Sequence, residues 1–147
     1  MNTYQIIKNS NLIVHYLSGD VTASLIIEQM KRISLEQDYS IYYDVITDLR
    51  DSNVKTEIQE IGGFVDFVTN DLKIVAKRKV IYLTSKPYEV VLTTLLSDVI
   101  KNSEINIYVC STIDSAVNFI DNADINKQSL NDLINGMKTN SLTTAHK

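Results

Sequence analysis

The feature that most constrains the fold is a regular exchange between two hydrophobic periodicities after the first 40 residues. Short runs rich in Val, Ile and Tyr, typical of strands, occur at residues 43–49, 80–84 and 105–110. Between them, apolar residues recur every three or four positions, which is the spacing of an amphipathic helix. Strands and helices in alternation indicate an α/β sheet with parallel strands and right-handed crossovers.

The N-terminal residues depart from this alternation. Residues 4–8 and 12–17 both have the pattern of strands, and the turn-forming sequence Asn-Ser-Asn between them predicts a hairpin. The Ser-Gly-Asp sequence at 18–20 is expected to end the second strand. The chain is therefore predicted to form an α/β fold. Its five-stranded mixed sheet begins with the N-terminal hairpin and continues in β–α alternation, with four helices and a C-terminal helical extension.

The clearest amphipathic helix follows the third strand. Thr56 and Gln59 form a capping-box pattern, in which two side chains satisfy free amides at a helix start. The spacing of the next apolar residues predicts a core-facing stripe made of Ile58, Ile61, Val65 and Val68. Phe64 and Phe67 are expected to face away from that stripe.

The other helices have weaker signals. The first is expected over residues 22–36, and the fourth is expected to be capped by Ser111 or Thr112. Pro87 suits the first position of the third helix, where its missing amide costs nothing. This third helix is expected to be largely buried through Val91, Leu92, Leu95, Leu96 and Val99.

Composition narrows the class of protein. The chain has 147 residues, a length typical of one domain, and its net charge of −4 gives no electrostatic reason to bind nucleic acid. No apolar run approaches the roughly 20 residues that cross a bilayer, and no signal-peptide pattern is present. The single cysteine, Cys110, excludes an internal disulfide. These observations predict a cytoplasmic protein with no integral membrane segment.

Four short motifs, taken in order, resemble a known family. They are Gly19-Asp-Val-Thr22, Thr47-Asp-Leu-Arg-Asp51, Arg78-Lys-Val-Ile-Tyr-Leu-Thr84 and Ser111-Thr-Ile-Asp-Ser-Ala116. Together with the order of elements, they resemble the SpoIIAA-like subgroup of STAS-type domains, which is distantly related to CRAL-TRIO lipid-transfer domains. The resemblance implies a non-enzymatic regulatory or protein-interaction module. On this basis we expect the domain over residues 1–122, a helical extension over 123–138 and a disordered tail over 139–147.

The first candidate site is the polar sequence that follows the third strand. Asp48, Arg50 and Asp51 are expected at the carboxyl edge of the sheet, where open α/β sheets tend to bind ligands. The alternative is structural: the two carboxylates accept hydrogen bonds from loop amides, and the arginine pairs with one of them.

The same sequence contains two candidate phospho-acceptors, Ser52 and Thr56. STAS-type anti-anti-sigma factors carry a phosphorylatable serine at the start of the second helix, in an acid-Ser-Ser-Gly setting. Here Asp51 and Ser52 are followed by Asn-Val, so Ser52 is only a loose counterpart. Added phosphate charge would be favourable at a helix N-terminus. In this hypothesis, residues 48–56 and the second helix contact a protein partner or a second copy of the chain.

The alternative hypothesis is a carrier or sensor of a small apolar or amphipathic, lipid-like ligand. Its cleft is expected between the second and third helices, lined by Phe64, Phe67, Tyr88 and Leu92. An enzyme of unknown reaction ranks last, because His15, His146 and Cys110 lack the neighbours that a catalytic residue, a metal or another cofactor would need. The basic run Lys77-Arg-Lys79 is expected to be a solvated connection.

Overall fold

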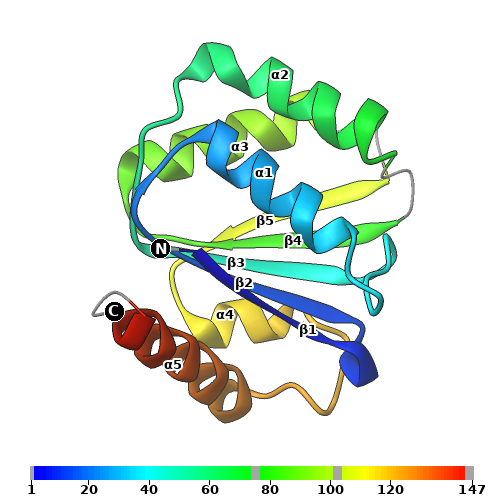
Figure 1. The fold of residues 1–147 in the computed structure, drawn as a ribbon, viewed down its shortest axis with the longest axis vertical. Coiled ribbons are helices and arrows are strands. Elements are labelled where there is room, and N and C mark those ends of the chain that lie inside the picture. Colours follow the sequence, from blue (N-terminus) through cyan, green and yellow to red (C-terminus); the bar gives the residue numbers. More distant parts are fainter. Residues whose placement is uncertain (1, 74–76, 101–103, 145–147) are drawn as a thin grey trace.

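The protein folds around one five-stranded sheet. In the computed structural model, which describes residues 2–73, 77–100 and 104–144, the strand order is β1-β2-β3-β4-β5 (Figure 1). β1 pairs with β2 in antiparallel fashion, and all later pairs are parallel. The predicted mixed sheet is therefore confirmed. The strands are β1 (Asn2–Ile7), β2 (Leu12–Val21), β3 (Asp44–Val54), β4 (Arg78–Leu83) and β5 (Ile105–Cys110).

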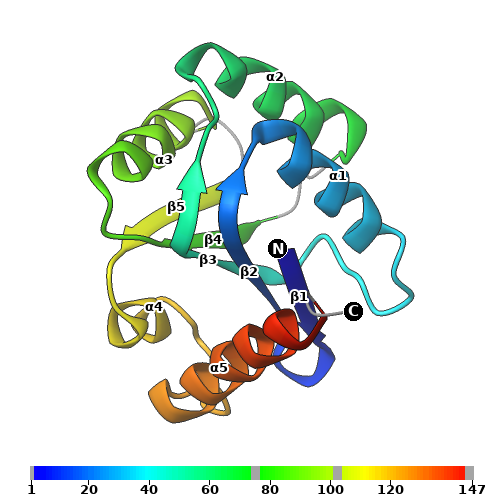
Figure 2. The same cartoon turned by 60° about the vertical axis from the view of Figure 1, so that its left-hand side comes forward.

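Helices cover both faces of the sheet. α1, α2 and α3 form a layer on one face, whereas α4 and α5 lie on the other (Figures 1 and 2). The helices are α1 (Ala23–Ser34), α2 (Ile61–Asp66), α3 (Pro87–Ile100), α4 (Ile113–Asn118) and α5 (Lys127–Thr144). Short turns are η1 (Lys8–Ser10), η2 (Ile58–Glu60) before α2, and the π-helical η3 (Phe67–Asp71) after it.

The helix starts follow the predicted capping chemistry with one exception. Thr22 caps α1, Thr112 caps α4, and α3 begins at Pro87, as expected. Before α2, however, the capping box consists of Glu57 and Glu60. It lies one residue later than the predicted Thr56–Gln59 pair, because the Glu57 carboxylate accepts from the backbone of Glu60 and the Glu60 carboxylate accepts from the Glu57 amide at 2.6 Å.

Both strands at the candidate site are longer than predicted. β2 continues through the Ser-Gly-Asp sequence, since Gly19 adopts a φ of 73°, which a side chain would disfavour. β3 continues to Val54, and Ser18 to Val21 pair with Asp51 to Val54. The register shifts between Tyr16 and Ser18, where β3 contains one extra residue.

Several helix residues lie on a different face from the one predicted. Ile58 is 52% exposed, because it belongs to η2 rather than to the regular turns of α2. Phe67, expected to face away from the core, is buried in it. Val91 and Val99, expected to be buried in α3, are exposed. Apolar residues spaced three and four positions apart fit more than one face of a helix, so the spacing alone does not decide which of them is buried.

The C-terminal extension is one long helix. Leu130, Ile134 and Met137 of α5 are buried in the cluster that covers the lower face of the sheet in Figure 1. Residues 139–144, expected in a disordered tail, continue α5, and residues 145–147 lie outside the described part of the chain. None of the described helices is both long and apolar enough to cross a bilayer.

His15 makes folding stability depend on pH. It is buried in β2, its Nε2 atom has no partner, and burial lowers its pKa from 6.5 to about 4 despite a hydrogen bond with Gln29. Between these two values the unfolded chain binds more protons, so stability should fall as pH falls through 6.5 towards 4. We expect a loss of roughly 1 kcal/mol between pH 7 and pH 5.5 from this residue.

Urea unfolding at both pH values measures this loss. His15→Gln should remove it, and His146→Gln is the control for losing the chain's other histidine. An unchanged pH dependence in His15→Gln would contradict the assignment.

Candidate functional site

A partly enclosed cavity lies between the sheet and the layer of α1, α2 and α3. Its volume is about 150 Å³, and most of its lining is aliphatic or aromatic. Side chains from β3, β4 and all three helices contribute, among them Met30, Val45, Leu49, Ile61, Phe64, Val68, Val80, Leu92 and Leu96. The cavity therefore occupies the position of a core that the helices do not completely fill.

Three of the predicted site residues line this cavity, namely Thr56, Phe64 and Leu92. Phe67 does not, because it is packed in the neighbouring core cluster beneath Lys31. Tyr88 is also outside the lining. It is 46% exposed, and its hydroxyl donates to the carbonyl oxygen of Thr56 at 2.8 Å, so it ties the start of α3 to the β3–α2 loop.

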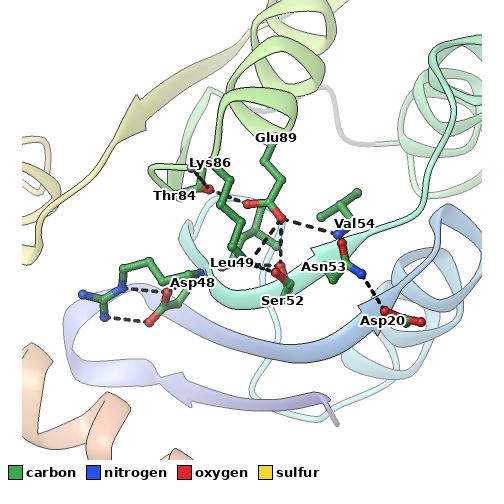
Figure 3. Close-up of polar contacts among 10 residues, drawn as sticks. Asp20, Asp48, Leu49, Ser52, Asn53, Val54, Thr84, Lys86 and Glu89 are labelled. Atoms are coloured by element: carbon green, nitrogen blue, oxygen red, sulfur yellow. Dashed lines mark hydrogen bonds and ion pairs between the residues drawn. The ribbon is translucent and has the colours of Figure 1, made fainter.

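A buried carboxylate forms one polar end of the cavity. Glu89, in the first turn of α3, is 2% exposed and lines the cavity. Figure 3 shows its polar contacts with residues of β3 and with Thr84. The hydroxyl of Thr84 donates to its Oε2 at 2.5 Å, and the amide of Val54 donates to its Oε1 at 3.4 Å. Lys86 Nζ lies 3.9 Å from the same Oε1. Glu89 thus joins α3 to the ends of β3 and β4.

Ser52, the first candidate phospho-acceptor, lies beside Glu89 inside β3. It is 1% exposed, and its hydroxyl is 2.7 Å from the carbonyl oxygen of Leu49 but 3.5 Å from Glu89. The hydroxyl therefore donates its single proton to the carbonyl oxygen of Leu49. A kinase could reach this hydroxyl only if the strand end opened, and the new phosphate would lie next to a buried carboxylate.

The second candidate phospho-acceptor, Thr56, lies at the edge of the cavity. Its hydroxyl oxygen is buried and has no hydrogen-bond partner within the described part of the chain. A buried hydroxyl without a partner is unfavourable, so Thr56 offers a donor to any molecule that enters from this side.

The remaining predicted residues form a separate cluster on the opposite face, against α5. Asp48 is fully buried and accepts from Arg50 Nε at 3.0 Å and Nη2 at 2.8 Å, and this bonding raises the arginine pKa. Asp51 contacts Lys138 of α5 at 2.7 Å and the hydroxyl of Tyr16 at 2.9 Å. The bond from Lys138 lowers the Asp51 pKa. The Asp48–Arg50 pair matches the structural alternative. Asp51 instead accepts from side chains of α5 and β2, and this contact joins α5 to the sheet.

The sheet thus divides the predicted site between its two faces. Sequence reasoning also missed the two charged residues of the cavity lining, Glu89 and Arg78. Arg78 belongs to the run expected to be solvated, yet it is 4% exposed. The only signal in the sequence was alternation along β4, which places Arg78 on the same face as Val80 and Tyr82.

Comparison with known proteins adds no further assignment. No protein-family model matches the chain, and no curated protein is similar enough to count as a relative. The SpoIIAA-like resemblance therefore stays a prediction from the sequence motifs.

Glu89 should contribute strongly to stability. Glu89→Ala leaves the donors of Thr84 and Val54 without an acceptor and enlarges the cavity, so we expect a loss of roughly 2–3 kcal/mol in the free energy of unfolding. Glu89→Gln keeps an acceptor and should cost about 1 kcal/mol.

Urea denaturation at pH 7 provides the measurement. Asp98→Ala is the matched control, because Asp98 is an exposed acid on the same helix and should change stability by no more than about 0.5 kcal/mol. Equal losses for Glu89→Ala and Asp98→Ala would contradict the role of the buried carboxylate.

Proposed function

We propose that this protein is a carrier or sensor that binds a small apolar or amphipathic molecule in the cavity beneath α1, α2 and α3. The observation that supports the proposal is the cavity itself. Space of about 150 Å³ remains beside buried residues that otherwise pack in clusters, among them Leu49, Val68 and Leu92. No catalytic step forms part of the proposal.

Physical chemistry favours filling such a space. A largely apolar cavity of this volume can take up a molecule as large as benzene. Unfilled volume destabilises a core by about 24 cal/mol per Å³ in large-to-small substitutions, so a ligand that fits recovers part of that loss. Phe64 and Leu92, predicted from the sequence to line a ligand cleft, are both in the lining.

Filling the cavity from within should abolish binding. Val80→Phe places a larger side chain at the centre of the lining, and Val91→Phe adds the same volume on the exposed face of α3 as the matched control. With octanol as an uncharged probe, we expect the wild type and Val91→Phe to gain several degrees in Tm. Val80→Phe should gain less than 1 °C.

Native mass spectrometry of protein purified gently from its own host is the companion measurement. A bound molecule that is lost on denaturation should be present in the wild type and Val91→Phe and absent in Val80→Phe. An octanol response that survives in Val80→Phe would place binding elsewhere. No octanol response in the wild type would count against the proposal altogether.

A second candidate function is the protein-interaction module implied by the SpoIIAA-like resemblance. It is favoured by three large apolar side chains, Ile58, Tyr88 and Val91, that remain exposed on η2 and the first turns of α3. The Tyr88 hydroxyl donates to the carbonyl oxygen of Thr56, so this surface adjoins one of the two predicted phospho-acceptors. A covalent gain of one phosphate in the same mass spectrum would support a switch there.

Self-association tests the second candidate most directly. If the exposed surface joins two copies, sedimentation equilibrium should show a mass that rises with concentration. Ile58→Asp should weaken that association at least tenfold, because it puts a charge in the contact. Leu35→Asp is the control, since Leu35 is an exposed apolar residue that follows α1. A monomer at all concentrations would exclude the homo-oligomer.

A further inference from the structure

The end of the cavity opposite Glu89 holds a buried cation. Arg78 begins β4, is 4% exposed and lines the cavity together with Tyr39. Its Nε donates to the carbonyl oxygen of Tyr43 at 2.8 Å, whereas its Nη2 is buried and has no partner. Seven ion pairs form among the described residues and none includes this guanidinium, although Asp44 is near enough to act on it and raise its pKa.

This arrangement is costly for a protein interior. Moving a charge out of water is strongly unfavourable unless the charge gains a partner, so buried charges are ordinarily paired. Burial lowers the Arg78 pKa from its usual value, but a guanidinium stays protonated at neutral pH. Arg78 therefore presents a positive charge and an unused N–H donor to a cavity that is otherwise almost entirely apolar.

Tyr39 adds a second donor at the same end. It is hydrogen bonded to Arg78, and it lines the cavity. A phenol that accepts from the guanidinium still has its own proton to donate. A guanidinium and a hydroxyl side by side suit the two oxygens of a carboxylate, which accept charge-assisted hydrogen bonds in a planar geometry.

The two ends of the cavity differ, and the difference favours one orientation of an anion. At the end near β3 and α3, the Glu89 carboxylate already accepts from Thr84 and lies 3.9 Å from Lys86, whereas Arg78 at the other end has an unused donor for an anion. Arg78 and Tyr82 both line the cavity and are four residues apart in β4, which corresponds to roughly 13 Å along the strand. Val80 and Phe64 line the cavity as well, so an apolar body can extend away from the cation.

We propose that the cavity binds a monocarboxylate with a compact apolar body, its carboxylate on Arg78 and its body along β4 towards Tyr82. The inference rests on the ligand-binding function proposed above and names its ligand class. The volume of about 150 Å³ equals that of a cavity known to hold benzene, so the apolar body has about six to ten carbon atoms. A medium-chain fatty acid and a small aromatic acid share this chemistry.

Calorimetric titration with octanoate and octanol tests the proposal, because the two probes differ only in the headgroup. The wild type should bind octanoate at least tenfold more tightly than octanol at pH 7. Arg78→Met should lose at least tenfold for octanoate and stay within about twofold for octanol. Lys79→Met is the matched control, since Lys79 is the next residue of β4 but binds Asp121 and the carbonyl oxygen of Phe119 instead.

The outcomes distinguish failure of the carboxylate assignment from failure of the proposed ligand-binding function. Equal affinities of the wild type for the two probes, or an octanoate preference that persists in Arg78→Met, overturn the role of Arg78 but leave the cavity as a binding site. Binding of neither probe overturns both proposals. Comparing the affinity for phenylacetate with that for octanoate then shows whether the cavity prefers an aromatic acid or a fatty acid.

A second measurement does not depend on any variant folding. In a pH titration followed by NMR, the ¹³C-labelled carboxyl of bound octanoate should stay ionised below the pH at which the free acid becomes protonated, because the guanidinium stabilises the anion. A bound carboxyl that is protonated at a higher pH than the free acid lies in apolar surroundings without a cation, and that result overturns the proposal.

Discussion

The parallel pairing of β2, β3, β4 and β5 in chain order determines most of this structure. Each strand lies beside the one before it, so each crossover must return in the same direction. Right-handed connections then place α1, α2 and α3 on a single face. The other face would be bare, and α4 and α5 cover it after the last strand (Figure 1). The two helix layers consequently have separate cores.

This separation explains why the polar residues in the second half of β3 serve two purposes. The extra residue in β3 changes the face on which successive side chains lie. Asp51 reaches Lys138 of α5, whereas Ser52, the next residue, lies beside Glu89 of α3. On the α5 face, the buried Asp48 forms an ion pair with the partly exposed Arg50. One continuous sequence therefore secures both layers to the sheet.

The sequence predicted the elements well and the site only in part. Periodicity and capping residues located α1, α3 and α4, because Thr22, Pro87 and Thr112 act through local bonds. Strict alternation could not reveal the extra residue in β3, which depends on pairing with β2. The burial of Glu89 and Arg78 depends on partners more than 30 residues away, Val54 and Tyr43, and no local pattern encodes such distances.

The helix α2, which covers part of the cavity, has a low intrinsic stability that its surroundings do not impose. Gly62 and Gly63 lie in α2, and a β-carbon at either position would meet no atom within 4 Å. Alanines would fit and would each favour the helix by about 1 kcal/mol. The π-helical turn at Phe67–Asp71 further disturbs its hydrogen bonding. We therefore expect transient unwinding of this one segment to expose the cavity at a smaller cost in free energy than separating any two strands of the sheet.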